Sequence, residues 1–200
     1  MGIFSKHHRY REEGQQPNVN NVMTYGRPYR SLYTSTKIFS MRHHIDITDD
    51  QGYLAYQANT RAISITDKTS IVDARGMLVA KIERKVFSMH ESHYITLANG
   101  PAFVLSKELF HIYNDIMNID GLGWQLRGNI YALNFQLYDA MGRIVAVISQ
   151  KWISMHDKYC VDLYQPGTEP AVIAILVTLQ HMIIDRENRQ RNTNNSFGGY

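Results

Sequence analysis

The feature that most constrains this chain is an apolar stretch near its C-terminus. Residues 171–184 are interrupted only by Thr178, Gln180 and His181. The stretch is longer than a usual strand, so we expect an α-helix. A helix that is apolar on nearly every side is either buried all round or lies in a membrane. Because spanning a bilayer takes about 20 apolar residues, the stretch predicts a helix, roughly 22 Å long, enclosed by protein.

Local signals define the ends of this helix. Thr168 is a suitable N-cap residue, and Pro170 would lie in the first turn, where its missing N–H costs nothing. A polar, charged stretch beginning at Asp185 follows the apolar residues. We therefore expect the helix to end there.

The sequence before this helix is typical of a meander of short strands. Runs of Val, Ile, Tyr, Phe and Leu alternate with the turn signals TDDQG, TDKT, DARG, ANGP, DGLG, DAMG, HDK and QPGTEP. A water-soluble chain of this kind must wrap its strands around the helix. We therefore predict a mainly β fold, a closed antiparallel barrel around a central C-terminal hydrophobic α-helix, which also removes exposed strand edges.

An internal repeat indicates that the predicted barrel consists of two equivalent halves. Residues 73–90 and 139–156 align at an offset of 66, and ten of the eighteen positions are identical. The shared Asp-x-x-Gly suits a hairpin turn, since Asp bonds the following backbone and Gly supplies a positive φ. A third such turn is Asp49 to Gly52. The identical pairs are Asp73/Asp139, Ala74/Ala140, Gly76/Gly142, Val79/Val145, Ala80/Ala146, Ile82/Ile148, Lys85/Lys151, Ser88/Ser154, Met89/Met155 and His90/His156.

The strand that follows each repeated turn has an inner and an outer side. Even positions are mostly apolar and face a core, whereas odd positions carry most of the charges. Valines also occur at odd positions, so we expect the outer side to be partly covered. The inward set is Leu78, Ala80, Ile82, Arg84 and Val86 with Ile144, Ala146, Ile148, Gln150 and Trp152.

Charge and composition suggest one domain with polar tails. We assign residues 1–31 and 186–200 as disordered tails and residues 32–185 as the barrel domain. The net charge of +3 comes from the ends, because residues 32–184 hold thirteen Lys/Arg against fourteen Asp/Glu. A nucleic-acid partner would need a basic stripe on the folded body, so we expect none. Cys160, the only cysteine, is expected to be a small buried residue, and no signal peptide or transmembrane segment is predicted; the natural compartment is the cytoplasm.

The run from about Tyr33 to Asp185 resembles the LURP-one-related (LOR) family of the Tubby C-terminal-like superfamily. The resemblance lies in KIFSMRHHIDITDDQG, SIVDARGMLVAKIERKVFSMHESHYI, GWQLRGNIYALNFQLYDAMGRIVAVISQKW and the final apolar helix. It implies a barrel of about twelve strands. Superfamily relatives include the phosphoinositide-binding tubby proteins and the phospholipid scramblases, which act at membranes. The family often carries an aspartate before the last helix, and Glu169 stands in for it here.

No pattern in the sequence predicts catalysis, a cofactor or a metal site. The repeated Ser-Met-His, residues 88–90 and 154–156, places a hydroxyl near an imidazole, but neighbouring side chains on a strand point apart. On a strand, His90 and His93 would point to opposite faces, so a shared zinc would need a turn there. No Gly-x-Ser-x-Gly elbow, Walker loop or GxGxxG is present. We therefore predict that the protein is not an enzyme.

The remaining candidate chemistry is the binding of an anion or a lipid head group. Arg84 is a charge at an inward position, and basic residues lie on the other side of the same two repeated strands. We predict a non-catalytic binding or scaffold domain that recognises an anionic lipid, a membrane surface or another phosphorylated ligand. The alternative is a structural, protein-interaction role through the surface and tails. The predicted anion contacts are Lys81, Arg84, Lys85, Arg143 and Lys151.

Overall fold

The structure, a computed structural model, describes residues 19–35, 44–63, 66–87, 90–106, 116–129, 134–151 and 158–196. It contains two helices, α1 (Val19–Tyr25) and α2 (Glu169–Ser196), within these ranges. The strands are β1 (Arg30–Ser35), β2 (His44–Thr48), β3 (Leu54–Ile63), β4 (Thr66–Asp73), β5 (Leu78–Phe87), β6 (His90–Leu97), β7 (Ala102–Ser106), β8 (Ile116–Ile119), β9 (Trp124–Asn129), β10 (Asn134–Tyr138), β11 (Ile144–Lys151) and β12 (Lys158–Leu163).

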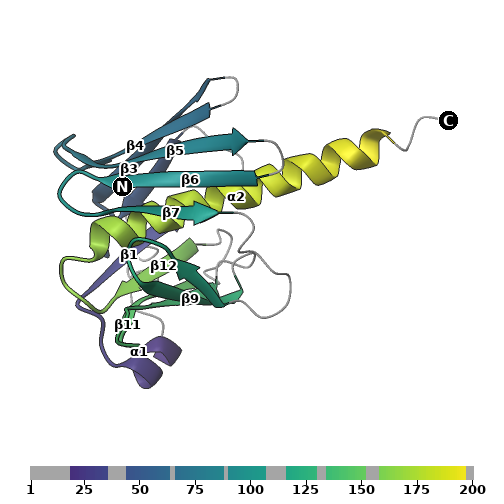
Figure 1. Ribbon diagram of the computed structural model, residues 1–200. Helices are drawn as coiled ribbons and strands as arrows, with labels where there is room; N and C mark the ends of the chain where they lie inside the picture. Colours follow the sequence, from purple (N-terminus) through teal and green to yellow (C-terminus); the bar gives the residue numbers. More distant parts are fainter. Residues whose placement is uncertain are drawn as a thin grey trace, which may run out of the picture.

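The twelve strands form one antiparallel sheet that curls into a nearly closed barrel (Figure 1). The order is β7-β6-β5-β4-β3-β2-β1-β12-β11-β10-β9-β8, so β7 and β8 are the two edges. Among the described residues, one bridge joins these edges, where the Val104 N–H donates to the Asp120 carbonyl at 3.2 Å. The predicted barrel and its strand number are confirmed.

Helix α2 occupies the interior of the barrel (Figure 1). Every residue from 171 to 185 is buried, so the apolar stretch is enclosed by strands as the sequence predicts. The Thr168 carbonyl accepts the first helical bond from the Val172 N–H at 3.1 Å, which confirms the predicted start. The helix runs to Ser196, about 42 Å at 1.5 Å per residue. It therefore continues beyond Asp185 into the segment assigned to the C-terminal tail. No helix in the described ranges is long and apolar enough to cross a membrane.

The three predicted Asp-x-x-Gly turns share one hydrogen-bonding scheme. In each, the aspartate Oδ1 accepts from the backbone N–H groups two and four residues on, at 2.8–3.0 Å. The closing glycine has a φ between 74° and 80°, which favours glycine. A register shift precedes each aspartate in the pairs β2/β3, β4/β5 and β10/β11. The aspartates are Asp49, Asp73 and Asp139.

The repeated residues form equivalent hairpins, β4–β5 and β10–β11. The repeated inner positions Ala80, Ile82, Ala146 and Ile148 are at most 2% exposed and pack in the core around α2. Leu78 is 40% exposed, because it lies at the turn end of its strand. The two Ser-Met-His sequences fall largely outside the described ranges.

Helix α1 lies within the segment assigned to the N-terminal tail. It stands beside β11 on the outside of the barrel (Figure 1). Its Asn21 side chain is 9% exposed and bonds to β11 and β12. At least this part of residues 1–31 is therefore packed on the domain.

Candidate functional site

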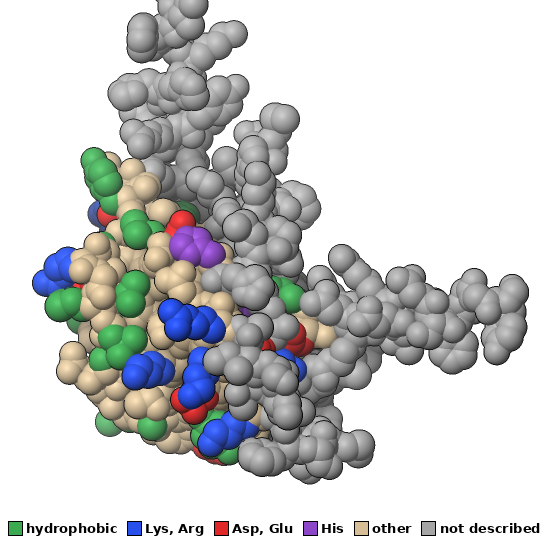
Figure 2. Space-filling model, turned by 90° about the horizontal axis from the view of Figure 1, so that it is seen from above, with side chains coloured by type: hydrophobic (Ala, Val, Ile, Leu, Met, Phe, Trp, Pro, Cys, Tyr) green, Lys and Arg blue, Asp and Glu red, His purple; other side chains and the backbone are tan. Residues whose placement is uncertain are grey.

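The outer side of β3, β4 and β5 carries a basic hollow, which we call the β3–β5 face. Arg61, Lys68 and Lys81 line a pocket of about 460 Å³ together with Glu83. Figure 2 shows basic side chains gathered on this side of the molecule. Each of these cations comes from a different strand, so the cluster depends on the register of the sheet.

The register places like charges opposite each other. Arg61 on β3 pairs directly with Lys68 on β4, and Lys68 pairs with Glu83 on β5. Lys81 lies two residues before Glu83, on the same side of the strand. The Lys68 Nζ lies 3.4 Å from the Glu83 carboxylate. In the described part of the chain, the side chains of Arg61 and Lys81 have no acidic partner.

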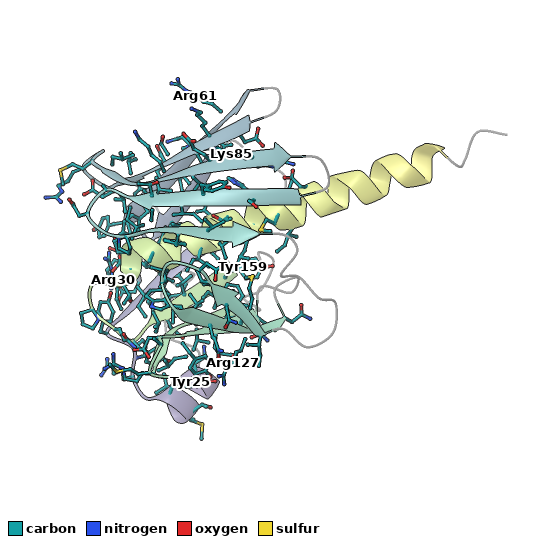
Figure 3. All side chains as sticks on the ribbon, viewed as in Figure 1. Tyr25, Arg30, Arg61, Lys85, Arg127 and Tyr159 are labelled. Carbon is teal, nitrogen blue, oxygen red and sulfur yellow. The ribbon has the colours of Figure 1, made fainter. Side chains whose placement is uncertain are left out.

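Lys85 extends this face toward β6. Its Nζ lies 4.8 Å from the centre of the Tyr94 ring, a cation–π contact. Arg61 on β3 and Lys85 on β5 lie on strands that pass along the same side of α2 (Figure 3). Of the five predicted anion contacts, the structure therefore brings Lys81 and Lys85 onto one face.

Arg84 points to the opposite side of β5, into the barrel, as its position in the sequence predicts. Its Nη1 lies 3.1 Å from the Asp67 carboxylate, and its Nη2 lies 3.4 Å from that of Asp185 on α2. The Arg84 side chain is 19% exposed. Two carboxylates already balance its charge, so Arg84 ties the helix to the sheet and lies away from the β3–β5 face.

The other two predicted contacts lie in the second half of the barrel. Arg143 closes the β10–β11 turn, and its Nη2 lies 2.7 Å from the Asp139 carboxylate. Lys151 ends β11, and its side chain lies outside the described part of the structure. The structure does not bring Arg143 to the basic face of β3–β5.

Sequence reasoning missed Arg61 and Lys68. They lie on β3 and β4, whereas the prediction considered only the two repeated strands. In NTRAI and TDKTS, the alternation of inward and outward positions along a strand could have assigned both residues to the outer side. Their proximity to Lys81 could not be inferred without the strand register.

Glu169 anchors the start of α2 to β1. Its carboxylate is 9% exposed and accepts a bond from Arg30 Nη1 at 2.6 Å and one from the Tyr29 hydroxyl at 3.2 Å. Burial and the neighbouring Glu169 charge raise the pKa of Tyr29 to about 12. A negative charge in the first helical turn also interacts favourably with the helix dipole. Glu169 therefore has a structural role.

Buried polar side chains also meet inside the barrel, near the end of the apolar stretch. His181 Nε2 lies 3.3 Å from the Thr60 hydroxyl, which lies 2.8 Å from that of Thr69. His181 is therefore a buried histidine that is hydrogen-bonded within the barrel. No group of three His, Cys, Asp or Glu side chains suited to a metal ion occurs among the residues that the structure describes.

Known proteins are similar to this chain in sequence and in fold. It is 24% identical over 157 residues to the uncharacterized protein YxjI of Bacillus subtilis (strain 168), covering 78% of this chain and 96% of YxjI. A solved X-ray structure of a protein from Arabidopsis thaliana covers 79% of this chain and 94% of that protein, with a TM-score of 0.53 and 16% identity. This second likeness concerns the fold.

The LURP-one-related family matches residues 30–180. The match runs from the first residue of β1 into the apolar part of α2, and therefore spans all twelve strands and the first part of the central helix. The chain belongs to the LURP-one-related family.

Proposed function

We propose that this domain is a non-catalytic binding module whose β3–β5 face takes a ligand that carries phosphate groups. The observation that carries the proposal is the basic pocket of about 460 Å³ around Arg61, Lys68 and Lys81. Its volume is within the usual range of small-ligand sites. We also propose that the protein works in the cytoplasm, where a chain with one buried cysteine has no need of disulfides.

The arrangement of charges supports an anionic ligand. Like charges directly opposite each other on neighbouring strands are unfavourable in a sheet, and Arg61 and Lys68 form such a pair. Glu83 offsets one of the three positive charges. A phosphate held between Arg61, Lys68 and Lys81 would relieve the repulsion and form charge-assisted hydrogen bonds.

The experiment compares soluble and membrane-bound phosphates. Isothermal titration with inositol hexakisphosphate tests a free phosphorylated ligand. Co-sedimentation with vesicles that contain phosphoinositide, and with vesicles that contain phosphatidylserine, tests a lipid head group and a merely anionic surface. We expect binding to the phosphorylated probes that weakens as salt concentration rises.

Two variants and a control decide whether the β3–β5 face is responsible. Arg61→Gln and Lys81→Gln each remove a charge-assisted contact worth about 1.5–3 kcal/mol, so we expect at least roughly tenfold weaker binding. Arg75→Gln is the control, because Arg75 is an exposed arginine of the same half that pairs with Asp73 in a turn. Absence of binding to every probe, or equal losses in all three variants, would overturn the proposal and favour the protein-interaction role.

A further inference from the structure

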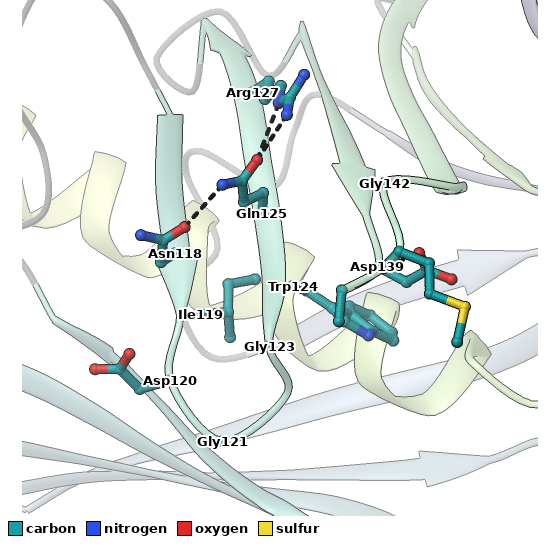
Figure 4. A pocket seen from close by; sticks show the side chains of 12 residues that line it. Asn118, Ile119, Asp120, Gly121, Gly123, Trp124, Gln125, Arg127, Asp139 and Gly142 are labelled. Atoms are coloured by element: carbon teal, nitrogen blue, oxygen red, sulfur yellow. Dashed lines mark hydrogen bonds between the residues drawn. The ribbon is translucent and has the colours of Figure 1, made fainter.

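A second pocket, of about 500 Å³, lies between the β8–β9 hairpin and the β10–β11 turn (Figure 4). We call it the hairpin pocket. It lies in the other half of the barrel from the β3–β5 face, and no residue lines both. The residues that matter for its chemistry are Asn118, Asp120, Trp124, Gln125, Arg127 and Met141.

Three of these side chains form a hydrogen-bonded row across β8 and β9. Arg127 donates to Gln125 Oε1 through Nη2 at 2.7 Å and through Nε at 3.2 Å. The Gln125 amide nitrogen in turn donates to Asn118 Oδ1 at 3.1 Å. The Arg127 guanidinium also lies 4.7 Å from the centre of the Tyr138 ring. These contacts fix the orientation of three planar polar groups before any ligand arrives.

The row leaves polar groups open to a ligand at one end. Asn118 and Asp120 are both exposed, two residues apart along the chain. Within the described ranges, the Asn118 amide nitrogen and the Asp120 carboxylate have no hydrogen-bond partner. Asn118 and Asp120 thus offer a donor and an acceptor on one side of the hairpin, and the partly buried Trp124 ring lines the same pocket from the other side of β9.

The backbone that carries these groups is held firmly. A Cβ atom at Gly121 would lie 2.7 Å from the Ala102 carbonyl oxygen, so the hairpin packs directly on β7. The bond from the Val104 N–H to the Asp120 carbonyl fixes the same point. The pocket wall is therefore preformed, which lowers the entropic cost of binding.

The balance of charge differs from that of the β3–β5 face. The positive charge of Arg127 is matched by the negative charge of Asp120. Asp139, which also lines the pocket, already accepts from Arg143 and Gln165. The hairpin pocket therefore has no surplus of positive charge that would attract a phosphate.

We propose that the hairpin pocket binds a neutral saccharide of one or two rings. Planar amides and a carboxylate suit the paired hydroxyl groups of a sugar, because each can donate to or accept from two neighbouring hydroxyls. An aromatic ring suits the apolar C–H side of the sugar. The volume also falls within the range of small-ligand sites. This proposal does not depend on the phosphate site.

The test uses the full chain and three neutral disaccharides, namely cellobiose, maltose and chitobiose. Nitrogen-15 NMR spectra are recorded during titration with each sugar at millimolar concentrations. We expect at least one of them to shift the indole N–H of Trp124 and the side-chain amides of Asn118 and Gln125. Trp152→Phe assigns the indole signal, because the chain has two tryptophans.

Variants of exposed side chains locate the site without disturbing the core. Asn118→Ala and Asp120→Ala each remove a hydrogen bond worth about 1.5 kcal/mol, so we expect roughly tenfold weaker binding. Lys81→Gln, which tests the β3–β5 face, should leave saccharide binding unchanged. Circular dichroism of each variant verifies folding.

Three outcomes would overturn the saccharide proposal. One is that none of the three disaccharides shifts these signals. Another is that the shifts survive both Asn118→Ala and Asp120→Ala. The third is that phosphate, or an extended peptide that shifts the backbone amides of β8, binds the pocket in place of a sugar.

Discussion

The outer sides of the two repeated hairpins differ sharply although their inner sides are alike. On β5, Lys81 is exposed and Glu83 is half-buried, and both line the basic pocket. At the equivalent positions on β11, Val147 is 1% exposed and Ser149 is 6% exposed. The same structural unit therefore has a solvent-exposed, charged outer side in one half of the barrel and a buried outer side in the other.

Helix α1 accounts for the difference. Its Asn21 donates to the Ser149 hydroxyl at 3.3 Å and to the Asp162 carboxylate at 3.1 Å. The rings of Tyr25 and Tyr164 meet edge to face, with centroids 6.1 Å apart. The second half thus uses its outer side to hold the N-terminal helix, while the first half leaves its outer side available for a ligand.

A buried carboxylate sits at the centre of the covered side. Asp162 is fully buried, and it accepts from the Ser31 hydroxyl at 2.6 Å and from the Cys160 thiol at 3.3 Å, in addition to Asn21. A buried charge is costly unless hydrogen bonds satisfy it. The docking of α1 therefore completes the hydrogen bonding of the buried Asp162 carboxylate.

Exchanging the equivalent outer residues of β5 and β11 should have the largest effect on the free energy of unfolding. Val147→Lys would place an uncompensated charge beneath α1, which we expect to lower the free energy of unfolding by about 3–5 kcal/mol. Lys81→Val, at the equivalent exposed position, should change it by no more than about 0.5 kcal/mol. Urea unfolding of both variants measures the two values. Similar changes in the free energy of unfolding for the two variants would show that the outer side of β11 is not buried. That result would contradict the difference between the two hairpins.

A smaller effect should follow from loosening α1 alone. Asn21→Ala removes two hydrogen bonds, one of them to a charged group, and should lower the free energy of unfolding by about 1–3 kcal/mol. Met23 on the same helix is 81% exposed, so Met23→Ala serves as the control with an effect within about 0.5 kcal/mol. Limited proteolysis should cut the Asn21→Ala variant near residues 19–29 sooner than the control. Equal cleavage rates would mean that Asn21 does not hold α1.

The sequence was sufficient for the barrel because its signals are local and periodic. The length and all-round apolarity of residues 171–184 require burial, and each Asp-x-x-Gly turn needs only its own backbone. The valines at odd positions predicted a partly covered outer side on both repeated strands; on β11 Val145 and Val147 are buried, whereas on β5 Lys81 is exposed. Helix α1 was not predicted, because the seven residues VNNVMTY show no apolar periodicity and are held by tertiary contacts of Asn21 and Tyr25.

The candidate site was only partly predictable, because it depends on long-range pairing. The alternation along β5 placed Lys81 and Lys85 outward and Arg84 inward, as the structure shows. Strand register brings Arg61 and Lys68 beside Lys81, and no local pattern in the sequence specifies that register. Individual orientations were therefore available from sequence, but the group of cations was not.

The turns of the two halves offer a finer comparison. Asp73 and Asp139 accept the same two backbone bonds, but Asp139 also accepts from Gln165 on the approach to α2, at 3.0 Å. Burial opposes the ionisation of Asp139, yet the hydrogen bonds from Arg143, Gln165 and Met141 outweigh it and lower its pKa to about 2. At Asp73 the bonds from Met77 and Arg75 lower the pKa as well. The second turn is thus linked to the start of the central helix, and the first is not.

This difference predicts a small, pH-dependent effect on stability. A carboxylate whose pKa is lower in the folded state stabilises the fold fully above its unfolded pKa near 4, and this contribution is lost as the pH falls toward the folded pKa. We therefore expect Asp139→Asn to lower the midpoint of urea unfolding at pH 6. Between about pH 4 and 2, the midpoint of this variant should fall less steeply with decreasing pH than that of the unchanged protein. Asp73→Asn should act in the same direction but more weakly, because Asp73 lacks the contact with Gln165. If the two variants were equally affected, the link from the β10–β11 turn to α2 would contribute nothing measurable, and the two turns would be energetically equivalent.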